Sequence, residues 1–104
     1  MSGDSLKTES GEPRRAYHWR VQGRVQGVSY RWFTQQTAEA LGVDGWVRNR
    51  ENGDVDVEAA GPAPVLDQLR ERLHDGPALA RVDSLLETEI DPDTIAPGRF
   101  EIRR

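Results

Sequence analysis

An Asn-Gly pair in the middle of the chain, Asn52-Gly53, constrains the fold more than any other feature of the sequence. It lies between two segments of alternating polarity, 43–50 and 55–60, and an Asn-Gly pair in that setting is the strongest short-range sign of a β-hairpin. A chain of 104 residues has room for one small domain with one hydrophobic core. The other elements are therefore expected to pack around this hairpin.

Strand and helix patterns flank the hairpin on both sides. Tyr17, Trp19 and Val21 alternate with polar residues and predict a half-buried strand over 16–22. A helix is expected after Ser29, a candidate N-cap, and it ends at Gly42. Its expected apolar stripe consists of Tyr30, Phe33, Thr37, Ala40 and Leu41. A second helix follows the Gly-Pro-rich segment 61–64, and its expected buried face consists of Val65, Leu66, Leu69 and Leu73.

The last part of the chain adds two extended segments. Residues 82–90 are expected to form a strand whose inner face the pattern does not decide, and Phe100 and Ile102 predict a short final strand. The order βαββαβ plus a C-terminal strand is typical of a ferredoxin-like α+β fold, an antiparallel sheet with two helices on one face. Right-handed crossovers then put the first and third strands at the centre of the sheet.

Composition limits the classes of function. Residues 1–14 are polar and without periodicity, so they are expected to be a disordered leader to a domain over 15–104. The chain has no cysteine, no signal-peptide pattern and no apolar run of membrane-spanning length, which indicates a cytoplasmic protein without disulfides or thiolate metal sites. A net charge of -4 argues against a nucleic-acid partner. A monomer is expected.

The stretch Val21–Arg31 is the candidate site. Its glycines allow a sharp turn just before a helix start, where unpaired N–H groups and the helix dipole favour an anion. Arg31, in the first helical turn, adds a planar fork of donors that matches two oxygens of a phosphate. Arg24, Arg48 and Arg50 are expected to join it in a positive pocket. On their own, Gly23 and Gly27 are equally typical of a plain turn, and an isolated Arg31 is typical of a solvated helix residue or a partner of Glu39 or Glu58.

Two separated motifs resemble those of the acylphosphatase family. The first is 23–31, GRVQGVSYR, followed by Gly42, and the second is 45–49, GWVRN, followed by the Asn52-Gly53 hairpin. The resemblance covers Tyr17 to Arg104. It implies hydrolysis of small acyl phosphates to a carboxylate and inorganic phosphate, without a metal or another cofactor. It also implies that Arg31 binds the phosphoryl group and that Asn49 orients the attacking water. The loop backbone, Arg24, Val25, Gln26, Gly27 and Val28, would donate N–H groups to the phosphate.

Two positions depart from the family pattern. Ser29 stands where a bulky apolar residue is more usual, which removes an apolar wall for the acyl group. Arg50 stands where some members have a hydroxyl residue, which removes a hydrogen bond that would steady Asn49. Trp32 lies off the apolar stripe, and we interpret it as a partly exposed ring on the helix flank rather than as a ligand-stacking residue.

The residues do not favour other chemistries. His18 and His74 lie on separate elements without matching ligands, and Ser29 has no histidine beside it. Asp54, Asp56 and Glu58 alternate along one strand and predict a solvated face, with a cation site as the alternative.

Three other functions share the expected fold. A binding or regulatory module predicts anion binding without turnover. An RNA-binding domain of the RRM type needs exposed strand aromatics and a basic face. An acylphosphatase-like domain of a carbamoyl-transfer enzyme of hydrogenase maturation is expected to continue into cysteine-rich zinc segments, whereas this sequence ends at Arg104.

Overall fold

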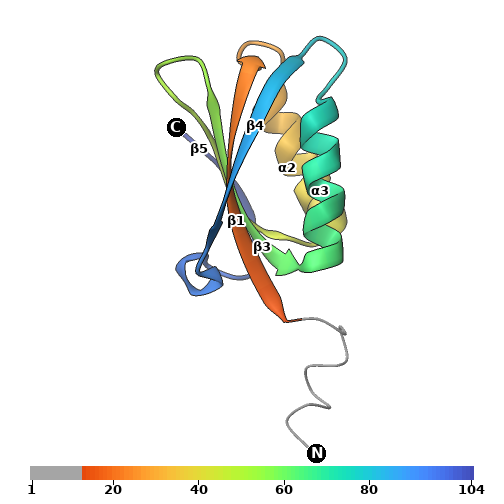
Figure 1. Cartoon of the computed structure of the whole chain (residues 1–104), viewed down its shortest axis with the longest axis vertical. Helices are drawn as coiled ribbons and strands as arrows, with labels where there is room; N and C mark the ends of the chain where they lie inside the picture. Colours follow the sequence, from red (N-terminus) through yellow and green to blue (C-terminus); the bar gives the residue numbers. More distant parts are fainter. Residues whose placement is uncertain (1–12) are drawn as a thin grey trace, which may run out of the picture.

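Two helices lie on one face of a five-stranded sheet in the computed structural model, which describes residues 13–104 (Figure 1). The elements are β1 (Arg14–Arg24), α2 (Tyr30–Leu41), β2 (Asp44–Asn49), β3 (Val55–Pro62), α3 (Ala63–Asp75), β4 (Arg81–Ile90), the short 3-10 helix η1 (Pro92–Thr94) and β5 (Phe100–Arg103). The strand order is β4-β1-β3-β2-β5, so β1 and β3 are interior strands, as expected. The expected leader lies outside the described residues up to position 12, and β1 already begins at its last residue, Arg14.

The sheet is mixed, which corrects the expectation of an antiparallel sheet. β1 pairs antiparallel with β3 and β4, and β2 pairs antiparallel with β3, but β2 and β5 are parallel. The reason is that the chain leaves β4 at one edge of the sheet, passes through η1 and reaches the opposite edge, where β5 runs in the same direction as β2. The hairpin itself is confirmed. Its connection spans residues 50–54, one residue longer than the sequence suggested.

The core lies between the sheet and the helices. Trp19, Val21 and Val57 are fully buried there, as are the expected α3 residues Leu66, Leu69 and Leu73, whereas Val65 is only partly buried.

Among residues 13–104, no helix is long and apolar enough to cross a membrane.

The buried stripe of α2 differs from the expected one. Thr34 and Ala38 are buried, whereas Ala40 is exposed. The Thr34 hydroxyl donates to the Tyr30 carbonyl oxygen at 2.9 Å, and the Thr37 hydroxyl donates to that of Phe33 at 2.8 Å. Because each hydroxyl is satisfied within its own helix, a polar side chain can face the core at little cost. The expected stripe is thus confirmed at Tyr30 and Thr37, which are buried, but it missed Thr34 and Ala38.

Candidate active site

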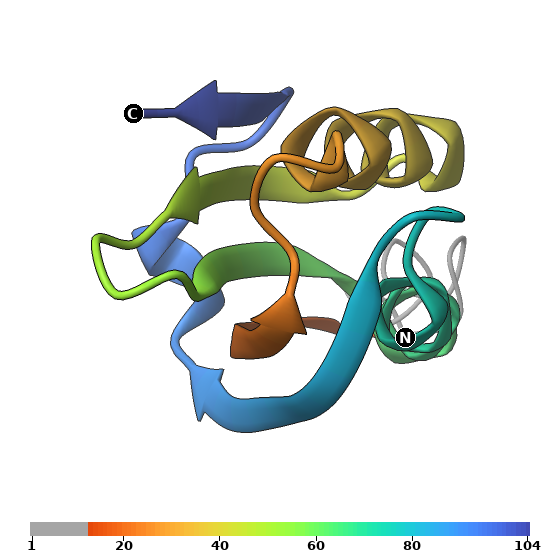
Figure 2. The same ribbon diagram turned by 90° about the horizontal axis from the view of Figure 1, so that it is seen from above.

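A cavity of about 240 Å³ lies where the β1–α2 loop, the start of α2, the end of β2 and β5 come together. Figure 2 shows this loop running from the end of β1 to the start of α2. The residues that line the cavity are Val25, Gln26, Gly27, Ser29, Tyr30, Arg31, Trp32, Asn49 and Ile102. Asn49 of β2 and residues of the loop thus line the same cavity. Of the other predicted site residues, Arg24 is exposed at the end of β1 and Val28 packs against the core, and neither lines the cavity.

The loop depends on backbone angles that most residues disfavour. Gly23 has φ 134°, and a Cβ there would lie 2.1 Å from the carbonyl oxygen of Arg81 on β4. Gly27 has φ 75°. Ser29 has φ 64°, the one positive φ outside glycine among the described residues, and it occupies the N-cap position of α2 without a side-chain cap bond. A non-glycine residue in the left-handed region is uncommon, and such strained residues cluster at functional sites.

The same geometry leaves donors free beside the cavity. Within residues 13–104, the N–H groups of residues 25–29 donate to no backbone carbonyl, and the first turn of α2 contains no acidic side chain. The orphan N–H groups of a helix start carry a partial positive charge. The loop and the helix start therefore present an anion-binding surface to the cavity.

Arg31 is half-buried at this helix start. Its Nη1 donates to the carbonyl oxygen of Arg103 on β5 at 3.3 Å, a long and single bond. The guanidinium has five donors, so this contact leaves most of the fork available to another acceptor. The contact with β5 thus orients the Arg31 side chain and leaves most of its donors available for a ligand.

Asn49 comes to the cavity from the other side. It is the last residue of β2 and lies opposite Val55 of β3 in the antiparallel register. Alternation along the strand puts it on the same face as Val47, which belongs to the core between sheet and helices. An amide at this point offers both a donor and an acceptor to a small molecule in the cavity.

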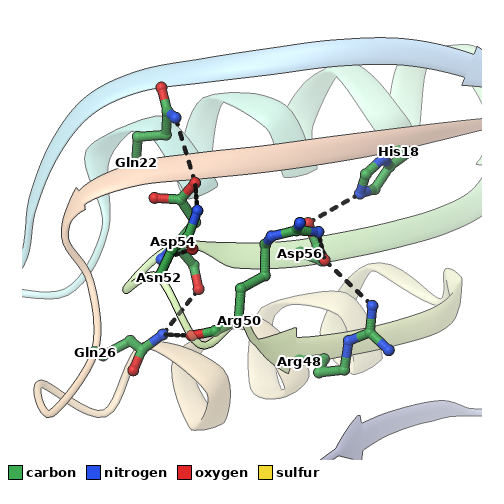
Figure 3. Close-up of polar contacts among 8 residues, drawn as sticks. All are labelled: His18, Gln22, Gln26, Arg48, Arg50, Asn52, Asp54 and Asp56. Carbon is green, nitrogen blue, oxygen red and sulfur yellow. Dashed lines mark hydrogen bonds and ion pairs between the residues drawn. The ribbon is translucent and has the colours of Figure 1, made fainter.

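Gln26 connects the two halves of the site through its side chain, a role that the sequence did not reveal. Its Nε2 donates to the backbone carbonyl oxygens of Arg50 at 2.7 Å and Asp54 at 2.9 Å (Figure 3). Both acceptors belong to the hairpin connection that follows Asn49. Local sequence patterns could not predict these bonds, because Gln26 lies 24 and 28 positions from its two acceptors.

The expected four-arginine pocket does not form. Arg50 Nη1 and Arg48 Nη2 contact Asp56 Oδ2 at 2.9 and 3.4 Å, and His18 Nε2 lies 3.1 Å from Asp56 Oδ1 (Figure 3). Asp56 is 1% exposed, so the expected solvated acidic face is wrong at this position. Burial alone would raise the pKa of Asp56, but hydrogen bonds from Arg50, His18 and Arg48 outweigh it and lower that pKa. Of the four arginines, only Arg31 lines the cavity.

Trp32 takes the exposed position expected on the flank of α2. Trp32 is 61% exposed and lines the same cavity as Arg31 and Asn49. Among residues 13–104, no three His, Asp or Glu side chains come together in a way that could hold a metal ion.

Comparisons with known proteins point to one family. The family model described as Acylphosphatase matches residues 17–102. An acylphosphatase of Koribacter versatilis is 46% identical over 91 residues, which cover 88% of this chain and 80% of that one. The crystal structure of acylphosphatase from Bacillus subtilis is 33% identical, with a TM-score of 0.79 over 86% of this chain and 99% of that one. HypF of T. kodakarensis is 29% identical with a TM-score of 0.74, but the match covers only 12% of that chain.

Proposed function

The chain belongs to the acylphosphatase family and is an enzyme that hydrolyses acyl phosphates, and from that premise we propose how its residues divide the reaction. Arg31 and the backbone N–H groups of the loop 24–28 bind the phosphoryl group, and Asn49 orients the attacking water. The observation that carries this proposal is the cavity of about 240 Å³ lined by Arg31, Asn49 and the loop. Its size suits a small substrate, since pockets for drug-sized ligands start at about 300 Å³.

Arg31 and the loop are suited to the charge of the phosphoryl group. Phosphoryl transfer passes through a loose transition state with charge spread over three equatorial oxygens. The Arg31 fork binds two of these oxygens, and the free N–H groups next to Gly27 and Ser29 bind the remaining charge. These donors are already held in place by the fold, so little reorganisation is needed when the charge develops.

The Asn49 side chain is suited to orient the attacking water. The water oxygen forms a bond to phosphorus as the bond from phosphorus to the acyl oxygen breaks. The carboxylate leaves with the bonding electron pair, and the proton of the water passes to the phosphate or to solvent. A carboxylate is a stable leaving group near neutral pH, so no general acid is required. Because the Asn49 amide is neutral, it can hold the water by hydrogen bonds without repelling the phosphate.

The test is the hydrolysis of benzoyl phosphate, followed by the loss of its absorbance, in the presence of EDTA. Arg31→Ala is expected to lower kcat/KM on the order of 10³-fold, as for other preorganised donors to a transferring phosphoryl group. Arg31→Lys keeps the charge but loses the fork, and it is expected to fall in between. Arg72→Ala, an exposed arginine on α3, is the matched control and is expected to keep wild-type activity.

Asn49→Ala and Asn49→Asp separate the water-orienting role from simple packing. Both are expected to lower kcat strongly, and the aspartate more so, because its charge repels the phosphoryl group. Full activity of both the Arg31 and Asn49 variants would refute the assignment. An inert wild-type protein that still binds phosphate would favour the binding or regulatory module.

We also infer the setting in which the enzyme works. We expect it to act as a monomer in the cytoplasm, without a nucleic-acid partner, on a small acyl phosphate and with no metal. Light scattering at micromolar concentration tests the monomer, and a binding assay with a labelled oligonucleotide tests the nucleic acid. Activity that is unchanged by EDTA tests the independence from metal.

A further inference from the structure

Two exposed apolar side chains lie at the phosphate-binding cavity. Trp32 is 61% exposed and Ile102 is 39% exposed, and both line the cavity together with Arg31 and Asn49. The described residues contain two other large apolar side chains with high exposure, Leu79 and Leu86, and neither lines this cavity. Large exposed apolar groups at a polar site are a common mark of ligand contact.

Separate elements bring these two side chains to the cavity. Trp32 follows Arg31 directly in the first turn of α2. Ile102 is on β5, opposite Val47 in the parallel register. It immediately precedes Arg103, whose carbonyl oxygen accepts the hydrogen bond from Arg31. Gln35 of α2 also donates to the carbonyl oxygen of Phe100 at 3.1 Å, so α2 and β5 are tied to each other along this edge. The relative position of the two apolar groups is therefore set by hydrogen bonds from α2 side chains to β5 carbonyl oxygens.

The loop side of the cavity offers no comparable apolar surface. Gly27 and Ser29 are both small and exposed, and the apolar loop residue Val25 is buried in the core. A substrate whose phosphoryl group sits on the loop and Arg31 therefore meets its main exposed apolar surface at Trp32 and Ile102.

We propose that Trp32 and Ile102 form the subsite for the acyl group, and that this subsite favours apolar, above all flat aromatic, acyl groups. The inference rests on the proposed function, because it needs the phosphoryl group at Arg31. An indole ring gains from offset stacking on another aromatic ring beyond the area that it buries. A cavity of about 240 Å³ leaves room for one small acyl group beside the phosphate.

A neighbouring cavity offers the opposite preference. It has a volume of about 550 Å³, shares Asn49, and is lined by Arg48, Arg50 and Arg104. An acyl group that carries a carboxylate would find cations there. However, Arg48 and Arg50 already contact the buried Asp56, which neutralises part of their charge. Asn49 also lines both cavities, and a water that it holds on the arginine-lined side would enter opposite an acyl group at Trp32 and Ile102. Both points favour the apolar side.

The experiment compares benzoyl, acetyl and succinyl phosphate on the full chain. We expect the wild type to have its lowest KM with benzoyl phosphate. Trp32→Ala is expected to raise that KM on the order of 10-fold, with a smaller effect on acetyl phosphate, so that the benzoyl preference in kcat/KM falls. Ile102→Ala is expected to act in the same direction more weakly. Trp32→Phe keeps a flat ring and is expected to retain most of the preference.

Leu79→Ala is the matched control, since Leu79 is 77% exposed and lies in the loop after α3. It is expected to leave the ratio of benzoyl to acetyl phosphate unchanged. Thermal unfolding of each variant checks that the exposed side chains were removed without loss of the fold.

The outcomes distinguish the two levels of inference. An active enzyme that depends on Arg31 and keeps an unchanged benzoyl preference in Trp32→Ala would overturn the acyl subsite alone. Succinyl phosphate as the best substrate would overturn it too, and would point to the arginine-lined cavity instead. Wild-type activity in Arg31→Ala would refute the proposed function itself.

Discussion

The contact of Gln26 with the hairpin predicts a loss of rate without a comparable loss of binding. Its Nε2 holds the β1–α2 loop to the carbonyl oxygens of Arg50 and Asp54, which follow Asn49, at 2.7 and 2.9 Å. Each such bond contributes about 1 kcal/mol net. If Gln26→Ala removes both, the loop and Asn49 lose about 2 kcal/mol of mutual positioning, which corresponds to a decrease of up to about 30-fold in kcat.

Folding should be affected less than positioning. The Asp54 carbonyl still accepts from the N–H of Arg50 at 2.8 Å, and the Arg50 carbonyl still accepts from the N–H of Gly53 at 3.2 Å. Neither acceptor is therefore left without a donor. Urea denaturation is expected to show a loss of at most about 2 kcal/mol in the free energy of unfolding.

The assay is steady-state hydrolysis of benzoyl phosphate with inorganic phosphate as a competing inhibitor. Because Arg31 and the loop N–H groups remain, the KM and the inhibition constant of phosphate are expected to stay within about 3-fold of wild type. Gln22→Ala is the matched control, since Gln22 is another amide that bonds Asp54, through its carboxylate at 3.3 Å. It is expected to cost stability and leave kcat intact.

A double-mutant cycle decides the reasoning. If Gln26 acts through the position of Asn49, then Gln26→Ala should change kcat little in an Asn49→Ala background. Equal effects of Gln26→Ala in both backgrounds would refute the positioning role. A variant that is destabilised but keeps the wild-type kcat would show that the contact is only structural.

Three further predictions concern stability. The pKa of Asp56 is lower in the folded chain than its usual value of about 4. The unfolded chain therefore takes up the proton first as the pH falls, and the free energy of unfolding should decrease below about pH 5. Asp56→Asn should flatten this decrease in urea titrations at several pH values. Tyr30→Phe removes the buried hydrogen bond from the Tyr30 hydroxyl to the Leu73 carbonyl oxygen at 2.6 Å. In urea denaturation it should lower the free energy of unfolding by about 1–3 kcal/mol, and a decrease under about 0.5 kcal/mol would contradict the contact. Gly23→Ala puts a Cβ at 2.1 Å from the Arg81 carbonyl oxygen and should lower the melting temperature by more than about 8 °C, whereas an unchanged melting temperature would mean that the backbone moves freely there.

Local patterns predicted those parts of the fold that local physics determines. The hairpin at Asn52-Gly53, the strand at Trp19 and the Leu66, Leu69 and Leu73 face of α3 all follow from turn chemistry and periodicity, and all are present. The direction of β5 was missed, because it depends on which edge of the sheet the chain reaches after β4.

Polar residues account for most of the differences at the site. Asp56 is a surface residue by any local rule, yet three partners from two other strands and the hairpin allow its burial. Gln26 carries no sign of its partners, because they lie more than 20 positions away in the sequence. The motifs predicted that Arg31 and Asn49 belong together, and the shared cavity confirms that they are neighbours. Their roles in the reaction stay a prediction.

The contact between β5 and Arg31 also bears on the order in which the enzyme forms. The loop and hairpin halves of the site are joined by a contact over 24 positions, whereas Arg31 meets Arg103 over 72. Closing longer loops costs more entropy, so contacts of high sequence separation tend to form late. A chain emerging from a ribosome would therefore have the β2–β3 hairpin and both helices before β5 joins the sheet and completes the cavity. In refolding experiments, catalytic activity should return no earlier than the burial of Trp19, whose indole N–H donates to Glu87 over a similar separation of 68 positions.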